Sequence, residues 1–405
     1  MKILHTADWH LGKRLDPFSR LPEQRLVLEE ICEIAERESV DAILLAGDIF
    51  DTVNPSIEAL ELFYQVSKRL TANGKRALIG IAGNHDSPDR IEAPDPLAKE
   101  CGIILIGHPL SEIRPFTLES GLAITQSAPG FLELKLPDSE TPLRLILTPY
   151  ANGIRMKRFL GNEDPEAELR AILAQHWQET ASAFCDQAGV NILMTHLFVV
   201  SKQGERPIEP DDEKPILTVG GAQEIFTENF PDGIQYVALG HLHRRHQVSD
   251  SRFPIMYAGS PLSYSMSEAG QQKSVTIIEA RPGESVSLRE IALTQGKPLV
   301  RKTFSQVDDA ITWLTDHPEC WVELTMVSDD FLSSEDRKRL LGAHEGIVAI
   351  IPQIANSDSA IPDAPEIDLS KSMQDLFVDY FQHKHGQAPQ DDMLDLFQEI
   401  LAEDA

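Results

Sequence analysis

Short apolar runs alternate with stretches of helical spacing in the first part of the chain. Residues 2–6, 42–46 and 77–82 are mainly apolar runs of the kind found in buried strands. The stretches between them, 25–38 and 56–70, carry apolar side chains three and four residues apart, which is typical of amphipathic helices. This alternation predicts an α/β sandwich.

Side chains that can bind metals follow each predicted strand. Two later apolar runs, residues 191–196 and 236–241, also predict strands, so that five strands end in this way. The carboxyl ends of strands in an α/β sheet lie along one edge, and the side chains beyond them therefore converge on one crevice. The five segments are Asp8-x-His10, Gly47-Asp48-x-x-Asp51, Gly83-Asn84-His85-Asp86, Thr195-His196 and Gly240-His241-x-His243.

The ligand types in these segments indicate a site for two metal ions. One His or Asp after a strand is ordinarily a capped or solvated group, but five such segments in order are hard to produce by accident. Carboxylate, amide and imidazole ligands without thiolates suit Mn²⁺, Fe²⁺ or Zn²⁺, and Asp48 is able to bridge two ions. Two ions about 3.5–4 Å apart clamp a phosphodiester and activate the attacking water. A phosphate ester is the predicted substrate group, and the glycines before Asp48, Asn84 and His241 permit tight turns around it.

The pattern of elements changes after residue 280. Residues 275–278 and 286–291 predict two strands joined by a turn, and from residue 299 strand and helix patterns alternate as in a small α+β domain. A polar stretch with two prolines and no periodicity then predicts a linker. We therefore expect a catalytic domain over 1–280, an α+β capping domain over 281–355, a linker over 356–370 and a helical hairpin over 371–405.

The last segment carries two apolar stripes at helical spacing, one on each side of His385-Gly386. A hairpin of this kind buries little apolar surface alone, so its stripes are expected to lie on another protein. The alternative is that they pack back on the capping domain of the same chain. The residues expected to make the contact are Phe377, Tyr380, Phe381, Leu396, Phe397 and Ile400.

Charge limits the functions that fit this chain. Its 405 residues include 36 Lys and Arg against 64 Asp and Glu, a net charge of −28. Taken alone, this balance argues against binding to nucleic acid, because affinity for phosphate backbones depends on clustered Lys and Arg. The last 50 residues hold 2 basic and 12 acidic side chains, so ten of the excess negative charges lie in the predicted linker and hairpin.

Cysteine spacing and hydropathy predict a cytoplasmic protein with no membrane segment. The four cysteines lie far apart and form no C-x-x-C pair, which indicates inert thiols rather than disulfides or a zinc site. No run of about 18 apolar residues is present, and the N-terminus lacks a secretory signal. The length corresponds to two or three domains.

The five segments resemble the signature of the calcineurin-like metallophosphoesterase family. More narrowly, HTADWHLGK at 5–13, AGDIFDTVNP at 46–55, AGNHDS at 82–87 and LGHLH at 239–243 resemble the SbcD family of bacterial exonuclease subunits. The resemblance implies a four-layer α/β/β/α sandwich with a small α+β capping domain and a C-terminal helical hairpin. It is strong over residues 1 to about 280 and looser beyond them.

The resemblance also implies a role for each site residue. Asp8, His10, Asp48 and His243 would hold one ion, and Asp48, Asn84, His196 and His241 would hold the other. His85 would stabilise the transition state or protonate the leaving oxygen. Archaeal and eukaryotic relatives usually have His at the position of Asp51, so that residue's role is not carried over, and Asp51 is expected instead to support the ring of His10 or His243. Asp86 would either fix the ring of His85 or cap a helix.

The function implied by the resemblance is that of a metal-dependent DNA nuclease. Such a protein is a double-strand 3'-to-5' exonuclease and a single-strand and hairpin endonuclease, with two Mn²⁺ ions or, alternatively, Mg²⁺. It would be a homodimer that acts on DNA ends and hairpins in DNA repair, recombination and replication. Its partner would be an SbcC-like ATPase with a coiled coil, in a heterotetramer on which the hairpin docks.

Two other functions stay open from the sequence. A phosphodiesterase for a small molecule would use the same metal ligands, but it leaves the last 125 residues without a purpose. A scaffold for DNA ends would need the fold and not the ions. A protein phosphatase is disfavoured, because Thr52 and Asp86 stand where phosphatases of this superfamily have Arg and Glu.

Overall fold

The structure is a computed structural model that describes residues 1–156, 164–202, 224–249, 252–328, 332–354, 376–378 and 394. The chain divides into two units, Met1–Val327 with Leu332–Gln353 and Ser328–Phe331 with Ile354–Ala405. In the second unit, residues 376–378 and 394 have helical backbone. The fold that positions the site belongs to the first unit.

The first sheet of this unit has six strands in the order β18-β17-β1-β4-β5-β6. Its parallel part confirms the three apolar runs predicted near the N-terminus. β17 and β18 form an antiparallel hairpin at the β1 edge. The strands are β1 (Lys2–Thr6), β4 (Ala42–Leu45), β5 (Ala77–Ile81), β6 (Ile103–Ile106), β17 (Ser274–Glu279) and β18 (Ser287–Ala292).

The β17–β18 hairpin crosses residue 280, where the catalytic domain is predicted to end. β18 pairs with β17 from Ser274 opposite Ala292 to Glu279 opposite Ser287, so the first sheet continues past residue 280. Ile291 packs against the core beneath this sheet, and the side chain of Leu293 is buried in it. The domain that holds the sheet therefore includes β18, which the sequence boundary would separate from its partner strand.

The second sheet has eight strands in the order β15-β16-β14-β11-β10-β9-β8-β7. Its centre is parallel: β10 pairs with β11, β11 with β14, and β14 with β16. The strands are β7 (Phe116–Thr117), β8 (Ala123–Ala128), β9 (Phe131–Lys135), β10 (Leu143–Thr148), β11 (Val190–His196), β14 (Tyr236–Gly240), β15 (His246–Ser249) and β16 (Ile255–Tyr257).

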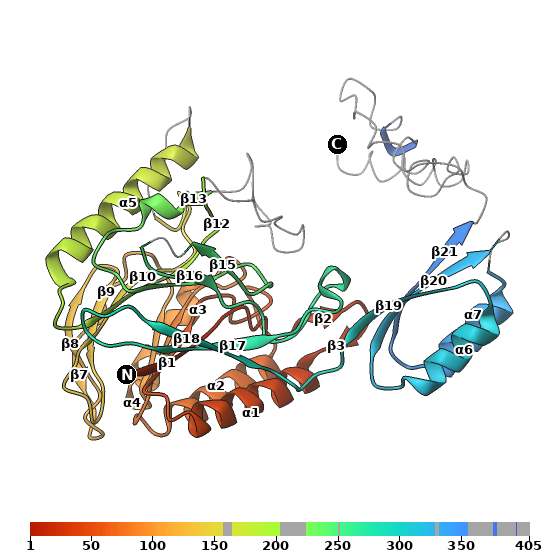
Figure 1. Cartoon of the computed structure of the whole chain (residues 1–405), viewed down its shortest axis with the longest axis horizontal. Helices are drawn as coiled ribbons and strands as arrows, with labels where there is room; N and C mark the ends of the chain where they lie inside the picture. The colour runs from red at the N-terminus through yellow and green to blue at the C-terminus, as the bar shows by residue number, and fades with distance from the viewer. Residues whose placement is uncertain are drawn as a thin grey trace. The chain divides into compact units, whose positions relative to one another are not determined.

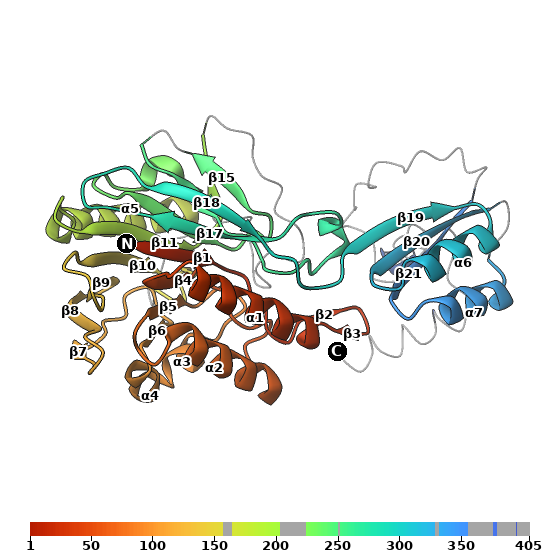
Figure 2. The ribbon, with the colours of Figure 1, turned by 60° about the horizontal axis from the view of Figure 1, so that its bottom comes forward.

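The two sheets face each other, and helices cover their outer sides (Figures 1 and 2). Side chains such as Leu44 and Ile79 from the first sheet meet Leu145 and Met194 from the second in one buried core. α1 (Leu21–Arg37) and α2 (Ile57–Thr71) cover the first sheet, and α5 (Pro165–Phe184) covers the second. These four layers confirm the predicted α/β/β/α sandwich.

Short strands, short helices and 3₁₀ turns lie between the main elements along the chain. Two parallel residue pairs join β12 to β13, and an antiparallel pairing joins β2 to β3. The elements are β2 (Arg14–Leu15), β3 (Phe18–Ser19), α3 (Pro88–Glu92), α4 (Asp95–Glu100), β12 (Val199–Val200), β13 (Ile225–Phe226) and the 3₁₀ turns η1 (Thr227–Asn229) and η2 (Met266–Glu268).

A small α+β layer with its own core follows the hairpin. Its elements match the strand and helix order predicted from residue 299 onward, and its sheet has the order β19-β20-β21. Leu314 and Leu340 from the two helices pack against Val322 and Leu324 from the middle strand. The elements are β19 (Leu299–Phe304), α6 (Val307–Asp316), β20 (Trp321–Ser328), α7 (Ser334–Ala343) and β21 (Ile347–Ile354). Among the helices described in the structure, none is long and apolar enough to cross a membrane.

Candidate metal centre

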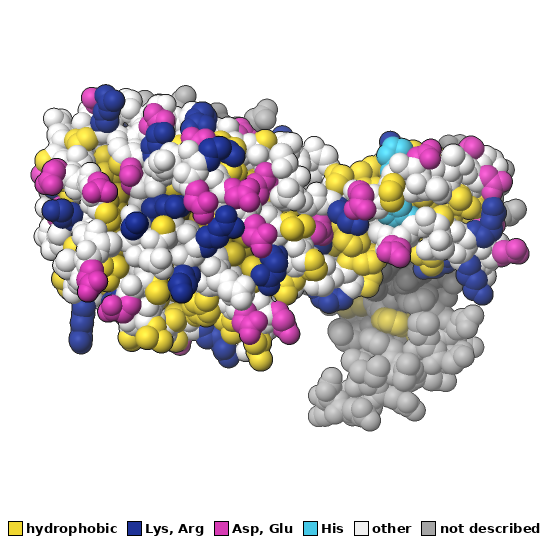
Figure 3. Space-filling model, turned by 90° about the horizontal axis from the view of Figure 1, so that it is seen from below, with side chains coloured by type: hydrophobic (Ala, Val, Ile, Leu, Met, Phe, Trp, Pro, Cys, Tyr) yellow, Lys and Arg dark blue, Asp and Glu magenta, His cyan; other side chains and the backbone are white. Residues whose placement is uncertain are grey.

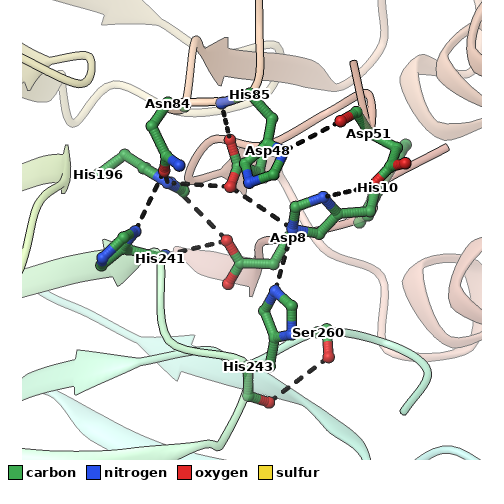
Figure 4. A network of polar contacts seen from close by, with 12 residues as sticks. Asp8, His10, Asp48, Asp51, Asn84, His85, His196, His241, His243 and Ser260 are labelled. Carbon is green, nitrogen blue, oxygen red and sulfur yellow. Dashed lines mark hydrogen bonds and ion pairs between the residues drawn. The ribbon is translucent and has the colours of Figure 1, made fainter. Parts of the chain in front are cut away.

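The five predicted segments meet at the carboxyl ends of strands in the two sheets (Figure 4). The backbone bends sharply there: Asp8, His10, Asp48 and His241 have positive φ angles of 54°, 43°, 45° and 109°. Left-handed backbone at residues other than glycine costs about 1–3 kcal/mol each and persists only where the surroundings enforce it. Here the N–H of Asp8 donates to the carbonyl of Gly47 at 3.0 Å, and the N–H of His10 donates to that of Asp48 at 2.9 Å.

Glycines allow the segments to approach one another closely. A Cβ on Gly47 would lie 2.1 Å from the His196 ring, and one on Gly83 would lie 2.1 Å from the Asp48 carboxylate. A Cβ on Gly240 would lie 1.8 Å from the carbonyl oxygen of Ala46. All three distances are far below contact distance, so each of these motif glycines is required by the packing of another segment against it.

The first group of ligand atoms lies around His10. Its Nε2 is 3.0 Å from the Nε2 of His243 and 3.5 Å from an Asp48 carboxylate oxygen. Asp8, His10 and Asp48 place one ligand atom each within 4.8 Å of one another, and all three side chains are buried. The structure therefore brings together the four residues predicted to hold one ion.

The second group lies around the amide oxygen of Asn84. This oxygen is 2.9 Å from the Nε2 of His196 and 3.1 Å from the Nδ1 of His241. The Nδ1 of His196 lies 2.9 Å from the carbonyl oxygen of Ala46 and donates to it, so Nε2 is the nitrogen that faces Asn84. These residues are the ones predicted to hold the other ion together with Asp48.

Asp48 connects the two groups. Its Oδ2 is 3.5 Å from the Nε2 of His10 and 3.3 Å from the Nε2 of His196, so that one oxygen faces a histidine of each group. Its Oδ1 accepts a hydrogen bond of 2.9 Å from the backbone N–H of His85. This contact fixes the carboxylate between the two groups.

The arrangement fits divalent cations. The Nε2 atoms of His10 and His243 face each other at 3.0 Å, and one buried oxygen of Asp8 has no hydrogen-bond partner in the structure. Burial raises the pKa of Asp8 well above its ordinary value. Burial alone would lower the pKa of His196, but the carboxylates of Asp48 and Asp8 and the carbonyl of Ala46 together raise this pKa to about 9. Each of these features indicates a site that is short of positive charge.

His85 lies beside the first group without completing it. Its Nδ1 is 2.9 Å from the backbone carbonyl oxygen of Asp51 and donates to it, and its Nε2 is buried without a hydrogen-bond partner in the structure. The ring contacts that of His10 edge to face, with the centroids 4.8 Å apart. His10, Asp51 and His85 also place ligand atoms within 4.8 Å of one another. The geometry presents one nitrogen of His85 to the crevice.

Asp51 and Asp86 have different roles from each other. Asp51 lies 3.5 Å from the Nδ1 of His10 and 3.1 Å from the ammonium of Lys13, which agrees with the predicted support of the His10 ring. Asp86 neither holds the His85 ring nor caps a helix. Its buried carboxylate accepts three backbone hydrogen bonds of 2.8–3.0 Å, from Gly83, Ile49 and Phe50. Burial and then the charge of Asp48 raise the pKa of Asp86 to about 6.

Three residues that support the centre were missed by the sequence analysis. The Nε2 of Gln24 donates to the carbonyls of His10 at 2.7 Å and Trp9 at 3.2 Å. Arg155 donates to the carbonyls of Gly83, Asn84 and Asp86 at 2.7, 3.3 and 2.8 Å. Glu268 lies against His243. All three make contacts with residues that are distant in the sequence, so the spacing of neighbouring residues does not predict them.

The predicted docking residues lie almost wholly outside the described part of the chain. Phe377 is described, has helical backbone and is half-buried. The others, Tyr380, Phe381, Leu396, Phe397 and Ile400, fall outside the described residues. The docking prediction therefore stays a prediction.

Comparison with known proteins agrees with the geometry of the centre. The calcineurin-like phosphoesterase family matches residues 1–245. The SbcD subunit of the nuclease SbcCD from Bacillus subtilis is 38% identical over 411 residues, 99% of this chain and 98% of that protein. The chain belongs to the calcineurin-like phosphoesterases, and within them to the SbcD family. The corresponding SbcCD nuclease protein of Rhodobacter capsulatus is 32% identical over 308 residues, 74% of this phosphoesterase and 71% of that protein.

Among solved structures, a dimetal phosphatase from Danio rerio is 12% identical over 73% of this phosphoesterase and 98% of that chain, with a TM-score of 0.40. A likeness this remote adds no argument about substrate. Membership in the family confirms the resemblance and makes this phosphoesterase a metal-dependent enzyme. The convergence of carboxylate, amide and imidazole ligands on one crevice agrees with it.

Proposed function

We propose that this phosphoesterase is a metal-dependent DNA nuclease and the catalytic subunit of an SbcCD-like complex. Two relatives that the chain matches over most of their length are nucleases named as subunits of such a complex. The observation that carries the proposal is the position of Asp48, since one of its oxygens faces a histidine of each ligand group. A shared carboxylate of this kind is what a two-metal phosphodiesterase requires.

The chain supplies two sets of ligands for this chemistry. When bound, two divalent ions stabilise the charge on the phosphate oxygens and acidify the attacking water. Because the ligands are buried and fixed in place, they do not need to reorganise during the reaction. The first ion would be held by Asp8, His10, Asp48 and His243, and the second by Asp48, Asn84, His196 and His241.

His85 is the proposed acid. Its Nδ1–H points at the carbonyl of Asp51, which fixes the plane of the ring and leaves Nε2 toward the crevice. In the protonated ring, Nε2 carries the proton that the leaving oxygen takes up as the P–O bond breaks. The backbone N–H of the same residue holds Asp48, so the acid and the shared ligand are fixed to each other.

The ligand set favours Mn²⁺, with Mg²⁺ as the alternative. Four imidazoles among the proposed ligands suit a borderline ion better than Mg²⁺, which prefers oxygen ligands and retains water. We propose double-strand 3'-to-5' exonuclease activity and endonuclease activity on single strands and hairpins, in DNA repair, recombination and replication.

We propose that the enzyme acts as a homodimer bound to an SbcC-like ATPase with a coiled coil. Three large apolar side chains of the first unit are exposed to solvent: Ile57 on α2 by 71%, Leu97 on α4 by 79% and Val53 before α2 by 58%. Exposed apolar groups of this size support contact with another protein. The predicted hairpin over residues 371–405 would dock on the ATPase, in a heterotetramer that engages DNA ends and hairpins.

A panel of substrates tests the proposed function. The full chain, with and without its ATPase partner, is incubated with hairpin DNA, blunt duplex DNA and bis-p-nitrophenyl phosphate in Mn²⁺ or Mg²⁺. We expect cleavage of both DNAs that depends on the metal and is stimulated by the partner. Hydrolysis of the small diester alone would instead indicate a phosphodiesterase for small molecules, and DNA end binding without cleavage, whether or not metal is present, would indicate a scaffold.

A further inference from the structure

A buried carboxylate lies directly behind one of the metal ligands. The side chain of Glu268, in the 3₁₀ turn η2, is 4% exposed, and its Oε1 is 3.3 Å from the Nδ1 of His243. The same oxygen accepts the backbone N–H groups of Tyr264 at 2.9 Å and Ser265 at 3.1 Å. Three donors therefore hold Glu268 in place against the ring of His243.

This contact decides which nitrogen of His243 faces the centre. Because Nδ1 donates its proton to Glu268, the lone pair of the neutral ring lies on Nε2. Nε2 is the nitrogen that lies 3.0 Å from the Nε2 of His10. A carboxylate that accepts the other N–H of a metal-binding imidazole fixes its tautomer and increases its basicity.

Lys273 joins the same network. Its ammonium contacts the Oε2 of Glu268 and donates to the backbone carbonyl of His243 at 2.9 Å and to the hydroxyl of Ser260 at 3.1 Å. The Lys273 ammonium balances the charge of the buried Glu268 carboxylate. It also binds the backbone of His243, the residue whose ring Glu268 contacts. The side chain and the main chain of His243 are thus fixed by one pair of charges.

We propose that Glu268, held by Lys273, is a positioning residue that orients His243 and strengthens its bond to the metal. The inference rests on the proposed ligand set, because it assigns Glu268 to His243. Glu268 also forms the capping box of η2 together with Ser265. A test must therefore distinguish the positioning of His243 from a purely structural role in this turn.

Calorimetric titration of the metal-free full chain with Mn²⁺ separates the two roles. Glu268→Gln keeps an oxygen for the backbone N–H groups and removes the charge, and Glu268→Ala removes both. Ser265→Ala is the matched control, because it removes the other side chain of the capping box and leaves Glu268 in place. Glu133→Gln is a second control, since Glu133 is a half-buried carboxylate paired with Arg144 in the second sheet.

We expect Glu268→Gln to weaken one of two Mn²⁺ sites by about 10–100-fold and to leave the other unchanged, the range typical of such supporting residues. Both controls should retain both affinities. The inference is overturned if Glu268→Gln and Glu268→Ala keep both sites within twofold of the original chain. It is also overturned if both sites weaken equally along with the melting temperature of the metal-free chain, because that result shows a structural role.

His243→Ala distinguishes this inference from the proposed ligand set. If His243→Ala weakens one site and the Glu268 variants do not, the ligand set stands and the role of Glu268 is refuted. If His243→Ala leaves both sites unchanged, the ligand set is wrong and the inference fails with it. The absorption spectrum of the Co²⁺-loaded chain gives an independent readout, since a changed geometry at one ion shifts its visible bands in Glu268→Gln and not in Ser265→Ala.

Discussion

Single residues set the geometry of the centre through backbone conformation and close contact. Asp8, His10, Asp48 and His241 combine ligand side chains with left-handed backbone, and Gly83 lets Asp48 approach to a distance that no side chain permits. The cost of this backbone is met by hydrogen bonds between segments. The ligands are therefore placed before any ion arrives.

Gly83→Ala tests this placement. Its Cβ would lie 2.1 Å from the Asp48 carboxylate, so Asp48 or the turn must move. Since a shift of about 1 Å at a reacting group costs about 100-fold in rate, we expect kcat/KM for DNA cleavage to fall by about that factor. The matched control is Gly342→Ala in helix α7, where a Cβ meets nothing within 4 Å. This control should keep full activity and be about 0.5–1 kcal/mol more stable; equal activity in the two variants would contradict the account.

At the scale of elements, the sequence predicts what repeats locally and misses what depends on distant contacts. The apolar runs of β1, β4, β5, β11 and β14 are clear because buried parallel strands are apolar throughout. No element is predicted between residues 83 and 190, where the structure has α3, α4, β6 to β10 and α5. The buried side chains of α5 recur every fourth residue, at Leu169, Leu173, Trp177 and Ala181, and that spacing could have revealed the helix.

The positions of the proposed ligands were predictable for the same reason, and the residues that support them were not. Every ligand follows a strand in a short motif, so its position depends on the nearby sequence. Gln24 lies 14 residues from His10, and Arg155 lies 72 residues from Gly83. Glu268 lies 25 residues from His243. These contacts depend on how the sheets meet, which residue spacing does not encode.

Fragments of the chain test whether the catalytic domain extends past residue 280 to include β18. A fragment of residues 1–280 ends before β18 and leaves β17, which still pairs with β1, with one open edge beside a buried core. We expect this fragment to aggregate, because an exposed apolar edge pairs with other chains. A fragment of residues 1–298 keeps the hairpin and should stay monodisperse in size-exclusion chromatography. Equal behaviour of the two fragments would mean that β18 is dispensable.

For the whole molecule, the negative charge has a different meaning from the one that composition suggests. Lys and Arg side chains are interspersed with Asp and Glu on the face drawn in Figure 3. Ten of the excess negative charges lie in the last 50 residues, outside the catalytic sheets. Two of the remaining carboxylates, Asp8 and Asp48, are proposed metal ligands. We therefore expect this protein alone to bind DNA weakly and to rely on metal, dimerisation and partner for affinity.

Deletion of residues 371–405 tests the proposed docking segment. The segment carries two apolar stripes that need another surface, so its loss should abolish co-purification with the SbcC-like ATPase. The ligands all lie before residue 244, and Mn²⁺-dependent hydrolysis of a small diester should therefore persist. Unchanged association of the shortened chain would refute docking through this segment and would favour its packing on the capping domain.

The central claim is that His85 acts on a phosphodiester between two ligand groups that share Asp48. The most direct measurement is Mn²⁺-dependent cleavage of hairpin DNA by His85→Ala and the original chain, with Mn²⁺ stoichiometry determined on the same samples. The account predicts two bound ions in both proteins and a rate about 100- to 10,000-fold lower in the variant, the range for loss of a general acid. Cleavage at the original rate by a variant that still binds both ions would contradict it.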